Sequence, residues 1–146
     1  LKISYKLINI PELNLENKLI KIDLPVKYRN IDNTRIIKLI LDKFYERLAE
    51  KEIEKIMEKI RIQTGLVPED YKIEKMSCIL GKYIEENKNV VINPEVVKFD
   101  KEIIEYVILH QVCHLKYKTH AKSFNRLLKE YIPNYKMIEE KIKGMF

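Results

Sequence analysis

The chain has 146 residues, of which 46% are hydrophobic and 34% charged, and its formal net charge is +6. This composition is typical of one globular domain and excludes a disordered or fibrous chain. No apolar run approaches the length of about 20 residues that a membrane-spanning helix needs, so we expect no membrane association.

The predicted elements begin with strands. Residues 2–10 and 18–24 are rich in Ile and Leu with partial alternation, which predicts two strands that form a hairpin. A long helix is predicted to begin at Asn33 or Thr34, either of which can cap it, and to end at Gly65.

The second half of the chain predicts more strands and then helices. Strands are expected in residues 71–84 and 90–93, followed by a helix that begins after Asp100. Two shorter helices are expected at about 121–131 and 134–143. The order of elements predicts an α+β fold in one domain, 1–146, with an N-terminal strand region (1–32) and a core (33–146).

The cysteines and the charge bear on the cellular setting. Cys78 and Cys113 are too few for a disulfide framework, and the first ten residues lack the pattern of a signal peptide. We therefore expect a cytoplasmic protein. The excess of lysine mildly favours an acidic partner such as nucleic acid, although most of these lysines fit solvated helix faces.

All three histidines lie in one short segment. His110 and His114 are four residues apart, which places them on one face of a helix at the spacing by which two imidazoles bind one zinc ion. His120 is a candidate third ligand, provided that the chain bends back after His114. Catalytic zinc sites have three protein ligands and leave the fourth position for water.

Gln111 follows the first histidine, where H-E-x-x-H peptidases carry a glutamate as general base. An amide has nearly the shape of a carboxylate, but it cannot accept a proton at neutral pH. Loss of a general base typically lowers the rate by about 10²–10⁴-fold. The glutamine is explained either by inactivation of a peptidase or by a natural pseudoenzyme. We favour the first, because the rest of the site is intact.

Several short motifs follow one another in a distinctive order. Residues 104–115, IEYVILHQVCHL, match the run V/I-x-Y-V-I/V-x-H-E-x-x-H-L, with glutamine in place of the glutamate. Four further motifs support this match. Met76-Ser77-Cys78 with Gly81 corresponds to W-G-S-C…G, and the strand that ends in Asn93 corresponds to I-x-L-N. His120 and Phe124 correspond to a third histidine followed by an aromatic residue, and Pro133-Asn134-Tyr135 corresponds to P-D-W/Y. From about Phe44 onward, the chain thus resembles the YgjP-like zinc metallopeptidases, relatives of the SprT-type proteases.

This resemblance implies a zincin-like fold with a small antiparallel sheet, and one zinc ion on His110, His114 and His120. It also implies that an edge strand formed by Val90, Val91, Ile92 and Asn93 pairs with an extended peptide substrate. The chain departs from the family pattern at Gln111, at Lys75-Met76 in place of an Arg-Trp pair, and in a longer segment between Cys78 and Val90.

Two tyrosines are candidates for stabilising an oxyanion. A phenol beside the zinc can donate a hydrogen bond to the developing charge, and Tyr117 and Tyr135 are close enough in sequence to be considered. An aromatic core role explains each of them as well. Tyr117 also stands where the metzincins, which share the histidine spacing, require a glycine, so we rank that family low.

We therefore predict a zinc-dependent peptidase that acts on peptides or unfolded proteins and that is impaired by Gln111. Two alternatives remain. The first is a non-catalytic binding module that zinc stabilises. The second is a SprT-type protease that acts on DNA-bound proteins and binds DNA through its basic surface.

Overall fold

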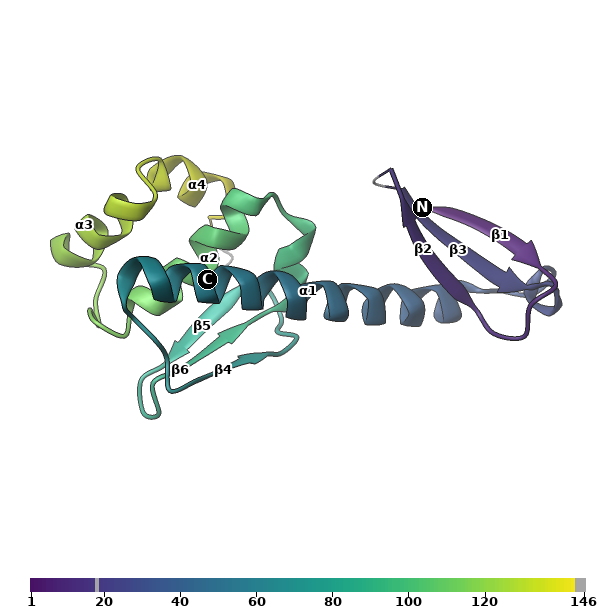
Figure 1. Cartoon of the computed structure of the whole chain (residues 1–146), viewed down its shortest axis with the longest axis horizontal. Helices are drawn as coiled ribbons and strands as arrows, with labels where there is room; N and C mark the ends of the chain where they lie inside the picture. The colour runs from purple at the N-terminus through teal and green to yellow at the C-terminus, as the bar shows by residue number, and fades with distance from the viewer. Residues whose placement is uncertain (18, 144–146) are drawn as a thin grey trace. The chain divides into compact units, whose positions relative to one another are not determined.

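The computed structural model describes residues 1–17 and 19–143. The chain divides into two compact units, Leu1–Glu46 and Arg47–Phe146, and their boundary falls within the long helix α1 (Thr34–Thr64) (Figure 1). Within the described ranges, no helix is both long and apolar enough to cross a membrane.

The N-terminal unit is built on a three-stranded sheet in the order β1 (Lys2–Lys6), β3 (Leu19–Pro25), β2 (Glu12–Glu16). Strand β2 pairs with β3 antiparallel, whereas β1 pairs with β3 parallel. The predicted hairpin between residues 2–10 and 18–24 is therefore wrong. The antiparallel partner of β3 is the polar strand β2, whose weak hydrophobic pattern does not predict a strand. A short 3₁₀ helix, η1 (Val26–Tyr28), follows β3.

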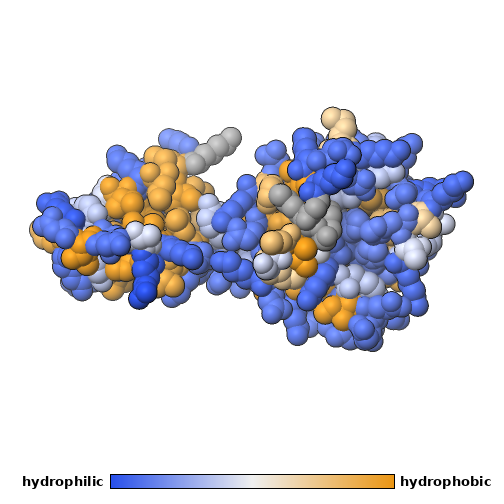
Figure 2. Space-filling model, turned by 180° about the vertical axis from the view of Figure 1, so that it is seen from behind, coloured by the Kyte–Doolittle hydropathy of each residue, from blue (hydrophilic) through white to orange (hydrophobic). Residues whose placement is uncertain are grey.

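Hydrophobic side chains gather on the surface of the N-terminal unit (Figure 2). Ile22 and Leu24 of the central strand are fully buried, but many other large apolar residues of this unit are exposed: Leu1, Ile3, Leu7, Ile10, Leu15, Leu19, Val26, Ile31 and Leu39. The continuous hydrophobic core lies in the C-terminal unit instead.

Helix α1 begins and ends as the sequence predicts. The Asp32 carboxylate accepts a hydrogen bond from the Thr34 backbone N–H at 3.0 Å, which satisfies a donor that the first turn leaves free. Gly65 follows the helix with φ +72°, and its N–H bonds to the Arg61 carbonyl, a left-handed C-terminal cap that favours glycine. The buried residues of α1 recur at threes and fours along the C-terminal unit: Ala49, Ile53, Ile56, Met57 and Ile60.

The C-terminal unit contains a second three-stranded sheet, in the order β4 (Asp70–Ile73), β6 (Asn89–Ile92), β5 (Gly81–Ile84). Strand β4 pairs with β6 parallel and β5 pairs with β6 antiparallel, so the sheet is mixed rather than purely antiparallel. Strand β6 is therefore central, and the prediction that residues 90–93 form an edge strand is wrong. Both sides of β6 are already hydrogen-bonded, which leaves no edge for a peptide.

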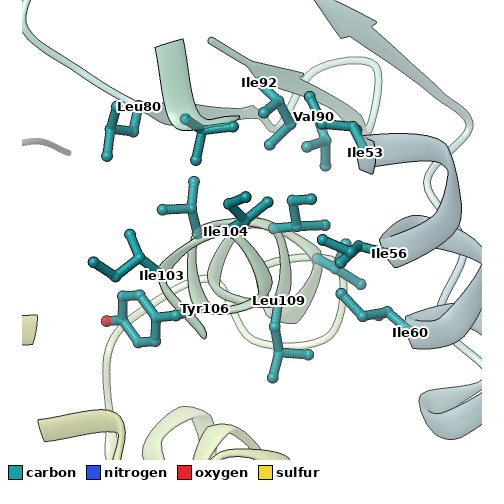
Figure 3. Packing of buried hydrophobic residues seen from close by; sticks show 14 of the residues in the cluster. Ile53, Ile56, Ile60, Leu80, Val90, Ile92, Ile103, Ile104, Tyr106 and Leu109 are labelled. Atoms are coloured by element: carbon teal, nitrogen blue, oxygen red, sulfur yellow. The ribbon is translucent and has the colours of Figure 1, made fainter. Parts of the chain in front are cut away.

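Helix α2 (Lys101–Cys113) lies at the centre of this core. Figure 3 looks along it, with Leu80, Val90 and Ile92 on one side and Ile53, Ile56 and Ile60 of α1 on another. The 3₁₀ helix η2 (Pro94–Lys98) leads into α2, and helices α3 (Lys122–Tyr131) and α4 (Tyr135–Lys141) follow it. Every residue of α2 from Tyr106 to Cys113 is buried, so packing holds this part of the helix from several sides. The architecture is α+β, as predicted.

Candidate metal centre

Three imidazoles converge where α2 ends. His110 lies in the last turn of α2, His114 is the residue that caps it, and His120 lies in the loop before α3. One possible ligand atom from each of the three lies within 4.8 Å of the others. Nε2 of His114 and Nε2 of His120 are 3.1 Å apart. Nitrogen ligands around a tetrahedral zinc ion are separated by about 3.3 Å, so this arrangement fits one ion.

His120 reaches the cluster because helix α2 ends at Cys113 and the chain changes direction in the loop that follows. The Tyr117 N–H bonds to the Cys113 carbonyl at 3.0 Å, which closes the end of α2, and the chain then turns back as predicted. Nζ of Lys118 in this loop lies 2.7 Å from Oε1 of Glu85, just after β5. Because both side chains are well exposed, this ion pair contributes little to stability.

Hydrogen bonds on the far side of two rings leave their other nitrogens for a metal. Nδ1 of His114 lies 3.2 Å from the Tyr117 carbonyl oxygen, which can only accept. Nδ1 therefore carries the proton, and Nε2 presents its lone pair to the cluster. Nδ1 of His110 lies 3.2 Å from the Tyr106 hydroxyl, so Nε2 is the ring nitrogen not engaged in this bond.

The surroundings keep two of the imidazoles neutral. Burial, followed by the nearby His120 and His114, lowers the pKa of His110 to about 3. Burial also lowers the pKa of His114, followed by the effect of His120. Histidine binds a metal ion as the neutral ring, so both residues are in the ligand state at neutral pH.

Two aromatic side chains hold the imidazoles in place. The ring of Phe124, on α3, is 1% exposed, and its centroid lies 5.1, 4.8 and 4.7 Å from those of His110, His114 and His120. Tyr83, on β5, stacks on His114 with a centroid distance of 5.7 Å and an interplanar angle of 13°. Tyr83 could not be predicted as part of the site from the sequence, because a lone tyrosine in a strand carries no signal of a distant partner.

Gln111 lies on α2, and its side chain is buried against the start of β5. Its side chain is so close to Gly81 that a Cβ there would lie 3.1 Å from Gln111 Cγ and 3.2 Å from Gln111 Nε2. The absence of a side chain at Gly81 therefore leaves room for Gln111, which a Cβ at this position would crowd. Because glutamate and glutamine have nearly the same shape, a carboxylate would occupy the same place.

The other predicted site residues lie in different surroundings. Tyr135 is buried in the core at the start of α4, and Tyr117 is half-buried and packs against the same core. An oxyanion role for their hydroxyls stays a prediction. Cys113 is a core residue, and burial raises the pKa of its thiol to about 12.

Asn93 has a structural role that the sequence did not reveal. Its amide nitrogen donates to the Met76 carbonyl at 2.9 Å and to the Ile79 carbonyl at 2.8 Å. Its side-chain oxygen accepts from the Glu95 N–H at 3.1 Å and so caps η2. The first two bonds hold the segment before β5 and the third caps η2, and together they explain the asparagine at this position.

The fold and the histidine cluster together define a metallopeptidase type of domain. The sequence profile of the YgjP-like metallopeptidase domain matches residues 1–145, and the chain belongs to this family. The family suggested by the motifs is thus confirmed, and the match also covers the first thirty residues, in which the sequence shows no motif of the family. No curated protein matches the chain significantly.

The fold is shared with solved structures, among them two metallopeptidase zymogens. The crystal structure of the metallopeptidase zymogen of Pyrococcus abyssi abylysin is 23% identical, with a TM-score of 0.56, over 62% of this chain and 90% of that one. The metallopeptidase zymogen of Methanocaldococcus jannaschii jannalysin is 29% identical, with a TM-score of 0.55, over 62% of this chain and 87% of that one.

Proposed function

We propose that this chain is a zinc metallopeptidase domain that binds one ion through His110, His114 and His120, and that Gln111 strongly impairs peptide hydrolysis. The observation that best supports the proposal is the convergence of three imidazole nitrogens within 4.8 Å in a member of a metallopeptidase family. Metallopeptidase zymogens among the structural relatives agree with this class of chemistry.

Each part of the site has a role in this proposal. Zinc held by three protein ligands lowers the pKa of a bound water to about 7 and polarises a carbonyl group. His110 and His114 are kept neutral, and Phe124 limits the rotation of the rings. Gln111 can orient a water molecule through a hydrogen bond, but it cannot take the proton that hydrolysis releases.

We also propose that an extended substrate pairs with β5 rather than with β6. Within the described part of the chain, β5 pairs with β6 alone, so its other side is an open edge. At the start of this strand, Gly81 lies against Gln111. Two residues further along, the ring of Tyr83 stacks on His114. A peptide added along this edge would bind through main-chain hydrogen bonds, which suits unfolded protein as a substrate.

The test of the metal site is the zinc content of the purified chain after dialysis, measured beside His120→Ala. We expect about one tightly held zinc per intact chain and a much weaker affinity in the variant, because a three-histidine site would lose one ligand. His120 is exposed, so the metal-free variant should unfold at the same temperature as the metal-free intact chain. An intact chain that holds no zinc would contradict the proposal.

Gln111 itself favours a second function, a non-catalytic binding module stabilised by zinc. An amide sits at the base position in a closely packed, buried place. Under this second function, chelation lowers the melting temperature, whereas the zinc-loaded Gln111→Glu variant hydrolyses no peptide. Hydrolysis by that variant would exclude it.

A further inference from the structure

We propose that Tyr106 and Glu139 are positioning residues that fix the tautomer of His110 and thereby prepare it as a metal ligand. The inference rests on the proposed zinc site, because it assigns these residues a role toward that site. Neither residue belongs to the histidine segment, and Glu139 comes from a different helix.

A chain of two hydrogen bonds connects α4 with the cluster. The Tyr106 hydroxyl lies 3.2 Å from Nδ1 of His110, one helical turn further along α2. The same hydroxyl donates to Oε1 of Glu139 on α4 at 2.8 Å. Tyr106 is 1% exposed and His110 7%, so the first of these contacts is shielded from water.

The direction of each proton follows from the chemistry of the groups. In the bond between Tyr106 and Glu139 the carboxylate oxygen accepts, so the phenol gives its single proton to Glu139. The Tyr106 oxygen is then left as an acceptor toward His110. Nδ1 of His110 must therefore carry the ring proton, and Nε2 is left with the lone pair that a metal ion needs.

This order of protons gives His110 the same tautomer that the Tyr117 carbonyl gives His114. The carbonyl enforces its tautomer because it can never donate. A hydroxyl alone can donate or accept, so it enforces a tautomer only when a second group takes its proton. Glu139 supplies that second group, and this gives a partly exposed residue on α4 an effect on a ring that it does not contact.

Groups that hydrogen-bond to the ring nitrogen of a ligand histidine that does not bind the metal typically raise metal affinity by about 10–100-fold. We expect a loss of this size in Tyr106→Phe, which keeps the buried ring and removes the hydroxyl. We expect a smaller loss in Glu139→Gln, because the amide can either accept from Tyr106 or donate to it. When the amide donates, the phenol proton is free to turn toward Nδ1 of His110, which permits the unwanted tautomer.

Two matched controls separate this effect from general damage. Tyr131, on α3, donates from its phenol to the Gln63 carbonyl at 3.0 Å, and Tyr131→Phe removes this bond. Glu140→Gln makes the same isosteric change at the exposed neighbour of Glu139. Both controls should leave the zinc affinity within about twofold of the intact chain, measured by competition with a chromophoric chelator.

The decisive readout is made without metal, by ¹⁵N NMR of the histidine rings in the intact, metal-free chain. Nδ1 and Nε2 have distinct shifts when protonated, so the spectrum reports the tautomer directly. We expect His110 to be protonated on Nδ1 in the intact chain and in Glu140→Gln. A mixture of both tautomers is expected in Glu139→Gln and in Tyr106→Phe, while His114 stays unchanged in all of them.

The outcomes distinguish this inference from the zinc site itself. If the intact chain shows Nδ1 protonation that Glu139→Gln disturbs, the positioning role stands even if zinc does not bind. A His110 protonated on Nε2 in the intact chain, or a tautomer that Glu139→Gln leaves unchanged, would overturn it. If Tyr106→Phe fails to fold, Glu139→Gln decides alone, because its site is only partly buried.

Discussion

Replacement of Phe124 by alanine should weaken both the fold and the metal site. The ring is 1% exposed and lies within about 5 Å of all three imidazoles, between centroids, so its removal leaves a cavity beneath them. Phe→Ala changes in a packed core cost about 3–5 kcal/mol. That is a large part of the roughly 5–15 kcal/mol by which a typical domain is stable.

The assay is urea denaturation, followed by circular dichroism, in chelator and again in excess zinc. Leu128→Ala is the matched control, because Leu128 is equally buried on α3 and forms part of the same core. Zinc at about 1,000 times its Kd should stabilise the control by about 4.1 kcal/mol. If the loss of Phe124 weakens zinc binding tenfold, the same zinc stabilises that variant by about 1.4 kcal/mol less. Equal zinc stabilisation of both variants would refute the idea that this ring organises the ligands.

Two further predictions concern residues near the site. Asn93→Ala should lower the free energy of unfolding by about 1–3 kcal/mol, because the buried amide would leave its carbonyl partners unpaired, and it should leave zinc affinity unchanged in a chelator competition. A weakened zinc affinity with an unaltered melting temperature would show instead that Asn93 acts at the site. Cys78 should react with a thiol reagent in the native chain at mildly alkaline pH, whereas Cys113, with its pKa raised to about 12 by burial, should react only after unfolding. Rapid loss of both thiols under native conditions would show that α2 opens readily.

The parts of the site that follow from one helix were predictable from sequence. The spacing of His110 and His114 is a local property of α2, and the return of His120 toward them was expected from the hypothesis of a shared metal ion. The family motifs located Gln111 in the same way. Helix periodicity could also have indicated Tyr106, since it stands four residues before His110.

The parts that depend on pairing between distant segments were not predictable. Residues 90–93 are apolar and short, a pattern that an edge strand and a central strand share, and only the neighbours of β6 decide between them. Likewise, Tyr83 and Glu139 approach the histidines from a strand and from the last helix. No regular spacing connects either residue with the motif, so their contacts required the structure.

The measurement that tests the account most directly is peptide hydrolysis by the zinc-loaded Gln111→Glu variant, compared with the zinc-loaded intact chain. The variant places a carboxylate where the packing against Gly81 already accepts the same shape. We expect its rate on an unfolded protein substrate to exceed that of the intact chain by about 10²–10⁴-fold, and chelation to abolish it. A folded variant that binds one zinc ion and still hydrolyses no peptide would contradict the account.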